Sequence, residues 1–130
     1  MLIVNGIADG LIDARDRGFA YGDGVFRTLP MRDGRISHWQ RHYQKLAAEC
    51  AALRLVCPRQ DVLEADIALI RSRQHDGVIR TTVTRGPGER GYACPDDPVI
   101  TRVVAWSAFK AMPNAAIRAR WCSLRLAIQP

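Results

Sequence analysis

The chain has 130 residues, which is the size of a single domain, and we expect residues 1–130 to form one domain. A hydrophobic fraction of 48% and a charged fraction of 25% are ordinary for a folded protein, so they exclude a disordered chain, a collagen-like repeat and a disulfide miniprotein. The formal net charge is +6, but the arginines are spread along the chain with no basic run. This pattern favours a solvated basic surface or a small anionic partner over nucleic acid.

The cysteines and the apolar runs indicate a reduced cytoplasmic protein without a metal or a membrane span. The four cysteines are far apart, no C-x-x-C pair is present, and the histidines stand at no zinc-motif spacing from them. The opening apolar run Leu2–Val4 meets Asn5-Gly6 at once and is too short for a secretory signal. The most apolar stretch, Val99–Phe109, contains Arg102 and falls well short of the roughly 20 residues that cross a bilayer.

The beginning of the chain predicts short strands joined by turns. Leu2–Val4 is typical of a strand that enters a turn at Asn5-Gly6. Asp13–Gly24 is rich in Asp, Arg and Gly and has neither a helical nor a strand period. Val25–Met31 follows as an extended segment, and Pro30 limits it to a sheet edge or a bulge.

The middle of the chain predicts a hairpin and two helices. The Asp-Gly pair inside Arg32–Arg35 indicates a hairpin turn, and a short return strand follows at Arg35–Ser37. Apolar residues then recur at three- and four-residue steps over Trp39–Leu55 and again over Gln60–Gln74, which is the period of amphipathic helices. Pro58 separates the two helices.

The rest of the chain predicts three more strands and one long loop. Val78–Thr84 alternates and is rich in β-branched residues, so we expect a strand there. Arg85–Pro98 is a loop rich in Gly and Pro, of a length that is usually either functional or disordered. Val99–Phe109 and Ala116–Leu126 complete the set as strands. The whole pattern predicts an α+β domain in which two helices pack on an antiparallel sheet.

Three segments carry residues that suit chemistry, although each also has an ordinary structural interpretation. Asp16–Leu29 combines glycines, aspartates and aromatic residues; it is an ordered loop followed by a strand, and its glycine spacing does not match a phosphate loop. Lys45 lies at the margin of the apolar stripe of its helix, where it is either simply exposed or able to reach an anion. Thr84–Tyr92 is either a solvated loop or a lid whose arginines bind a carboxylate.

The order and the text of these segments resemble a known family. The motif Ile-Val-Asn-Gly begins at Ile3, D-R-G-x-x-Y-G-D-G-x-F spans Asp16–Phe26, and H-x-x-[RK]-L spans His42–Leu46. Together they resemble the N-terminal half of the class IV, fold-type IV enzymes that use pyridoxal phosphate. This group contains branched-chain and D-amino-acid aminotransferases and 4-amino-4-deoxychorismate lyases. The resemblance implies the N-terminal α+β domain of that fold, and pyridoxal 5'-phosphate as the cofactor of the complete protein.

Within this family the sequence is most similar to the lyases. Thr28 stands two residues after Phe26, and R-G-x-G-x-R-G-Y spans Arg85–Tyr92, as in the lyase pattern. The similarity implies elimination of pyruvate from 4-amino-4-deoxychorismate to give 4-aminobenzoate, a step of folate biosynthesis. Two alternatives stay open: a class IV aminotransferase of the D-amino-acid or branched-chain type, and a non-catalytic anion-binding module that keeps this half of the fold.

The resemblance also implies roles for five residues. Thr28 is the catalytic candidate, because its hydroxyl would donate to the leaving enolpyruvyl group or orient it. Lys45 would hold the phosphate of the cofactor. Arg90 and Tyr92 would bind a carboxylate of the substrate, with Arg27 assisting. We therefore expect Thr28, Lys45 and Arg90 to line one shared pocket.

The sequence departs from the family pattern at three places. Arg27 stands where an acidic or small residue is common, and Lys45 stands where the family usually has an arginine, so the charge is kept and the planar fork is lost. The Schiff-base lysine of the family follows a segment resembling Leu124–Pro130, and neither Lys45 nor Lys110 matches it. We expect the 130 residues alone to be inactive. As partners we expect a small anionic substrate and a second copy in a homodimer, without nucleic acid or membrane.

Overall fold

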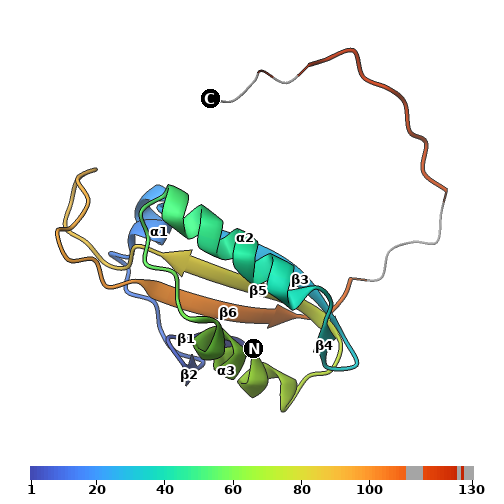
Figure 1. The fold of residues 1–130 in the computed structure, drawn as a ribbon, viewed down its shortest axis with the longest axis horizontal. Coiled ribbons are helices and arrows are strands. Elements are labelled where there is room, and N and C mark those ends of the chain that lie inside the picture. The colour runs from blue at the N-terminus through green and yellow to red at the C-terminus, as the bar shows by residue number, and fades with distance from the viewer. Residues whose placement is uncertain (111–115, 126, 128–130) are drawn as a thin grey trace.

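The computed structural model describes residues 1–110, 116–125 and 127. In chain order its elements are β1 (Leu2–Val4), β2 (Ile7–Ala8), α1 (Arg17–Tyr21), β3 (Gly24–Arg32), β4 (Arg35–Ile36), α2 (Trp39–Ala52), α3 (Gln60–Arg71), β5 (Gly77–Thr84) and β6 (Thr101–Ser107). The strands form one antiparallel sheet in the order β2-β1-β6-β5-β3-β4. This architecture confirms the predicted α+β fold, with two longer helices packed on an antiparallel sheet (Figure 1).

The hydrophobic core lies between one face of the sheet and the helices α2 and α3. Side chains alternate across a strand, so every second residue of each strand enters this core. The core is made of Ile3, Leu29, Met31, Leu46, Cys50, Leu55, Leu63, Ile67, Ile70, Ile79, Val83 and Val104. The opposite face of the sheet, here called the open face, is reached by α1 at one end, where Gly18 meets Thr84.

Strand β3 is almost an edge strand, as the proline within it predicts. It pairs with β5 along its length, from Gly24 to Met31. On its other side β4 pairs only with Met31 and Arg32, so within the described residues the remaining outer edge of β3 has no neighbouring strand. Pro30 lies in this unpaired stretch, where its missing N–H costs little. The edge position therefore confirms the expectation for Pro30.

Two short elements were not predicted. Strand β2 has two residues, too few for an alternating pattern. Helix α1 has five residues inside Asp13–Gly24, where the sequence has no helical period. Its ends carry the local signals of a helix: the Asp16 side chain accepts from the Gly18 N–H, and Gly22 ends the helix with a φ of 69°. A single turn is specified by such caps and not by periodicity.

The predicted strand over Ala116–Leu126 is wrong for the residues that the structure describes. Residues 116–125 are exposed, form no strand and lead away from the sheet (Figure 1). A strand needs a neighbour for its N–H and C=O groups, and these residues pair with none. The other elements are confirmed with small differences at their ends. Helices α2 and α3 and strand β6 stop before Leu55, Gln74 and Phe109, whereas β3 and β5 begin one residue earlier than predicted. None of the helices in the described part of the chain is long and apolar enough to cross a membrane.

Candidate functional site

A partly buried carboxylate, that of Asp23, holds the end of the sheet from which the loop Arg85–Pro98 begins. Asp23 Oδ2 accepts from Nε of Arg17 at 2.9 Å and from Nε of Arg85 at 2.8 Å, and its Oδ1 accepts from Nη2 of Arg85 at 3.1 Å. Arg85 also donates to the carbonyls of Leu53 and Arg54 after α2, at 2.8 and 3.2 Å. The hydrogen bonds from Arg85 and then Arg17 hold the pKa of Asp23 below its usual range. Through its bonds to Arg17 and Arg85, the Asp23 carboxylate thus links α1, the end of β5 and the residues that follow α2.

Arg17 fixes the loop that carries Arg90 and Tyr92. Its guanidinium is buried and donates to the carbonyls of Gly91, Tyr92 and Ala93 at 3.0 to 3.2 Å. The Tyr21 ring lies against the ring of Tyr92, with 5.6 Å between centroids, and the Tyr21 hydroxyl accepts from the Gly91 N–H. Segment Asp16–Gly24 therefore orders the loop, because the side chains of Arg17 and Tyr21 form hydrogen bonds with the loop backbone.

The structure explains why each of the first three positions of the D-R-G-x-x-Y motif needs its residue type. Asp16 accepts from the Thr84 hydroxyl at 2.9 Å, and this hydroxyl accepts from the Gly86 N–H at 3.1 Å. At Gly18 a Cβ atom would lie 2.2 Å from Thr84 Cγ2, so only glycine lets α1 approach β5 this closely. These contacts support the interpretation of Asp16–Gly24 as a scaffold.

A group of basic side chains lines a pocket of about 400 Å³ between β3 and α2. We call it the cationic pocket; its lining residues are Arg27, His38, Arg41, His42 and Lys45. Its neighbour Glu49 accepts from Arg27 Nη1 at 3.1 Å and lies 3.7 Å from Lys45 Nζ. Arg27 and Lys45 thus share one carboxylate, and Lys45 is held loosely, with 61% of its side chain exposed.

The electrostatics of the cationic pocket favour an anion. Partial burial, together with the positive charges of Arg27, His38 and Arg41, lowers the pKa of His42 below the ordinary histidine value. The Nε of Arg27 is buried and has no hydrogen-bond partner among the residues that the structure describes. A phosphate supplies acceptor oxygens and negative charge, so it fits this donor set.

The open face carries a second group around Thr28. Thr28 is exposed and stands opposite Arg80 in the register of β3 and β5. The Arg80 guanidinium lies 3.8 Å above the ring centroid of Phe26, which is also exposed. Phe26 and Arg80 line a pocket of about 230 Å³ that continues towards α1. A hydroxyl, a cation and an aromatic ring therefore meet on one surface of the sheet.

The five predicted residues do not share one pocket. Arg27 and Lys45 lie together, whereas Thr28 points to the opposite face of the sheet, because adjacent residues of a strand alternate. Arg90 lines a third pocket of about 370 Å³ within its own loop, and Tyr92 is 88% exposed beside Tyr21. The expectation that Thr28, Lys45 and Arg90 line one pocket is therefore wrong within this chain. Thr28 and the cationic pocket are separated by the thickness of β3.

Several residues of these two groups were missed from the sequence, although signals for them existed. His38, Arg41 or His42, Lys45 and Glu49 follow each other at three- and four-residue steps, which places them on one helical face. Arg80 was predicted to share a strand face with Thr82 and Thr84. The link from Arg80 to Thr28 needed the register between β3 and β5, which the sequence alone does not state.

Comparison with known families assigns the fold. The family model described as amino-transferase class IV matches residues 24–129, most of the chain. The chain belongs to this family. The match includes β3, α2 and β5, so both the cationic pocket and the open face lie within the part that the class IV model covers.

Two curated relatives of the class IV family extend the match. The aminodeoxychorismate lyase of Vibrio harveyi is 30% identical over 135 residues, which cover 100% of this chain and 49% of the lyase. The D-alanine aminotransferase of Listeria innocua serovar 6a is 31% identical over 110 residues, which cover 82% of this chain and 38% of that enzyme. The chain thus spans about half the length of the lyase and less of the aminotransferase.

Solved class IV structures give the same result. The crystal structure of 4-amino-4-deoxychorismate lyase from Pseudomonas aeruginosa superposes with a TM-score of 0.77 at 34% identity, covering 87% of this chain and 42% of that one. The PLP-bound form of a hypothetical aminotransferase from Mycobacterium tuberculosis superposes with a TM-score of 0.66 at 25% identity, covering 83% and 39%. In both comparisons this chain matches only part of the solved structure, which agrees with the predicted N-terminal half of the fold.

Proposed function

We propose that the complete protein is a pyridoxal-phosphate-dependent lyase that releases pyruvate from 4-amino-4-deoxychorismate and leaves 4-aminobenzoate, and that this chain provides the N-terminal side of its site. The observation that carries this proposal is the similarity to a lyase over the entire chain, whereas the aminotransferase match covers 82% of it. A lyase also gives the higher TM-score of the two structural comparisons above. The position of Thr28 and the loop Arg85–Tyr92 add to this support.

The cationic pocket is the part of the chain that fits the cofactor. When bound, pyridoxal phosphate supplies an electron sink that makes the C–H bond beside the substrate amine acidic. Lys45 and Arg27 would hold its phosphate, with the buried Nε of Arg27 and the ring of His42 as further donors. Binding of a phosphate would draw the two cations away from Glu49, which they share in the free chain.

The group on the open face suits the substrate. The Thr28 hydroxyl would donate to the ether oxygen of the enolpyruvyl group, where negative charge develops as the C–O bond breaks. The proton leaves the carbon that bears the amine, the ring becomes aromatic, and the released enol becomes pyruvate. Arg80, directly opposite Thr28 on β5, would bind a substrate carboxylate. Arg90 and Tyr92 would close over the other end of the substrate from their loop.

The unpaired outer edge of β3 relates these two groups to each other. Arg27 points to the α2 side of the strand and Thr28 to the open face, and no strand of the described chain covers the edge between them. A ligand that holds its phosphate beside α2 and its reacting part beside Thr28 would cross this edge. The separation of the two groups is therefore compatible with a single site completed by residues outside this chain.

The experiment is a product assay on the complete protein loaded with its cofactor. With 4-amino-4-deoxychorismate we expect equal amounts of pyruvate and 4-aminobenzoate. Thr28→Val should lower kcat about 100-fold or more, as expected for the loss of one donor to a developing oxyanion, and Thr28→Ser should restore most of it. Cofactor absorbance should be unchanged in both variants. Wild-type kcat in Thr28→Val would contradict the role of Thr28, and no pyruvate from the wild type would contradict the lyase.

A class IV aminotransferase is the second candidate, because the D-alanine aminotransferase relative is as similar over its aligned part as the lyase. This reaction would convert D-alanine and a 2-oxo acid into pyruvate and a new amino acid. The same assay separates the candidates: transamination consumes the added 2-oxo acid, whereas elimination needs none and yields 4-aminobenzoate. Only one of the two substrate sets should be turned over.

A further inference from the structure

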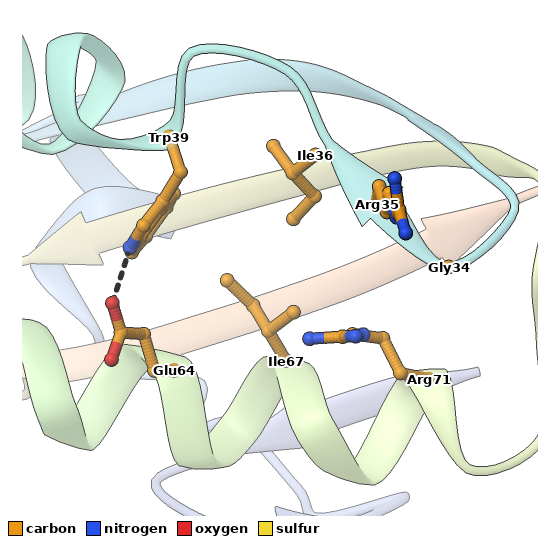
Figure 2. Close-up of a pocket in the computed structure, with 7 residues that line it drawn as sticks. All are labelled: Gly34, Arg35, Ile36, Trp39, Glu64, Ile67 and Arg71. Carbon is orange, nitrogen blue, oxygen red and sulfur yellow. Dashed lines mark hydrogen bonds between the residues drawn. The ribbon is translucent and has the colours of Figure 1, made fainter.

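A pocket of about 420 Å³ lies between the hairpin strand β4 and helix α3, away from the residues discussed above. We call it the β4–α3 pocket. Its volume falls in the range of about 300–1,000 Å³ that is common for small-molecule sites. Figure 2 shows that Trp39, Ile36 and Arg35 approach from the β4 side, whereas Glu64, Ile67 and Arg71 approach from α3. The pocket shares no residue with the cationic pocket or with the open-face group.

One end of the β4–α3 pocket carries two cations. Arg35 on β4 and Arg71 on α3 line this end of the pocket from its two sides (Figure 2), and both are exposed. Within the described residues neither forms an ion pair or a side-chain hydrogen bond. The Arg71 Nε lies only 3.9 Å from the position that a Cβ of Gly34 would occupy, so the guanidinium is placed beside the turn. Two guanidinium groups that have no partner among the described residues and line the same end of a pocket are suited to a carboxylate.

The opposite end carries an acceptor. The Trp39 indole N–H donates to Glu64 Oε1 at 2.6 Å, and the Gln60 amide donates to the same oxygen at 2.8 Å. These hydrogen bonds, from Gln60 and then Trp39, hold the pKa of Glu64 below its usual range. Both donors use Oε1, so the second carboxylate oxygen of Glu64 remains available to a donor on a ligand.

An apolar surface connects the two ends. Ile36 and the Trp39 ring line the middle of the pocket and are partly exposed, whereas Ile67 is buried in the core (Figure 2). Glu64 and Arg71 are seven residues apart on α3, which corresponds to about 10 Å along the helix axis. A single aromatic ring with a polar group at each end spans a distance of this order once a hydrogen bond is added on both sides.

We propose that the β4–α3 pocket is a binding site for an aromatic carboxylate that carries a hydrogen-bond donor at the opposite position of its ring. The carboxylate pairs with Arg35 and Arg71, the ring packs against Ile36 and the Trp39 ring, and the donor reaches Glu64. This assignment does not depend on the proposed lyase reaction, because the two sets of residues are separate. A saturable site of this kind would sense small aromatic acids outside the catalytic site.

The test is an NMR titration of the ¹⁵N-labelled chain of 130 residues, observed at the three tryptophan indole signals, with Trp39→Phe identifying the Trp39 signal. The probe is 4-aminobenzoate, its neutral counterpart is 4-aminobenzamide, and acetate supplies the anion without the ring. We expect a saturable shift of the Trp39 indole with 4-aminobenzoate, and little shift with the amide or with acetate. Arg71→Gln should weaken the binding of 4-aminobenzoate about tenfold, the loss of one charge-assisted pair.

The matched control is Arg73→Gln, which removes the same charge two residues further along, from another exposed arginine. It should bind 4-aminobenzoate as tightly as the wild type, and circular dichroism should show both variants folded. The proposal is overturned if the Trp39 signal does not saturate, if acetate or the amide shifts it equally, or if Arg73→Gln weakens binding as much as Arg71→Gln. A lack of pyruvate release by the complete protein would leave this result unaffected.

Discussion

Two clusters of basic residues differ in how far their charges are satisfied within the chain. In the first, Arg17 and Arg85 are almost fully buried and are surrounded by Asp23 and backbone carbonyls. In the second, Glu49 is the carboxylate that pairs with Arg27 and Lys45 of the cationic pocket, and within the described part of the chain the Nε of Arg27 has no partner. The first cluster therefore acts as structure, and the second is left with charge for a ligand. Arginine count alone cannot distinguish these uses.

The largest expected effect falls on the first cluster. Asp23→Asn removes the carboxylate and leaves Arg17 and Arg85 buried without a counter-charge, so the free energy of unfolding should drop by about 3–5 kcal/mol. Urea denaturation at neutral pH measures this change. The control Asp13→Asn breaks an exposed pair with Arg15 and should change stability little. Equal effects of the two substitutions would contradict the structural role of the first cluster.

The Asp23 carboxylate also makes the stability of the wild-type chain depend on pH. The pKa of Asp23 is lower in the folded chain than in the unfolded chain, because Arg85 and Arg17 stabilise its charged form. The stabilisation is therefore complete above the ordinary aspartate pKa near 4 and is lost as the pH falls below it. Asp23→Asn should remove this part of the acid dependence, so the stability difference between wild type and variant should shrink towards low pH.

Two substitutions in the second cluster should have smaller effects, and they should change phosphate affinity in opposite directions. Lys45→Gln should weaken the binding of inorganic phosphate about two- to fivefold, whereas Glu49→Gln should strengthen it by a similar factor, because it frees Arg27 and Lys45. Calorimetric titration at low salt measures both, and Glu89→Gln, on the Arg90 loop, is the control for net charge. Changes in the same direction for Lys45→Gln and Glu49→Gln would contradict a ligand role for this cluster.

The smallest effect is a shift in the titration of His42. Its pKa lies below the ordinary histidine value, since partial burial and the charges of Arg27, His38 and Arg41 disfavour its protonated form. Lowering the pH through the ordinary value near 6.5 therefore protonates the unfolded chain before the folded one, and it reduces stability. NMR titration of the ring should show this low midpoint, and added phosphate should raise it. An unchanged midpoint with saturating phosphate would place the anion elsewhere.

The sequence was sufficient for the fold wherever a periodic pattern or a turn signal was present. The stripes of α2 and α3, the alternation of β5 and the Asp-Gly turn before β4 all appear in the structure. It failed where a single contact decides the local structure, as at α1, whose caps depend on Asp16 and Gly22. It also failed at residues 116–125, because apolar residues interspersed with arginines do not reveal whether a neighbouring strand exists.

The candidate site was predictable residue by residue but not as an arrangement. Arg27 and Lys45 do meet, yet Thr28 was expected beside them although alternation along β3 turns it to the other face. Arg80 entered the group only through strand register, which is a long-range property. Motif resemblance names candidate residues, and the sheet decides which of them can contact the same ligand.

The proline near the end of β3 has a consequence for solution behaviour. An exposed strand edge invites another chain to add a strand, which is a common start of aggregation. Pro30 stands in the unpaired stretch of β3 and offers no amide hydrogen to an incoming chain. A residue that the sequence marks as a poor strand former thus guards the molecule against self-association through β-sheet extension, and it does so on the strand that presents Thr28.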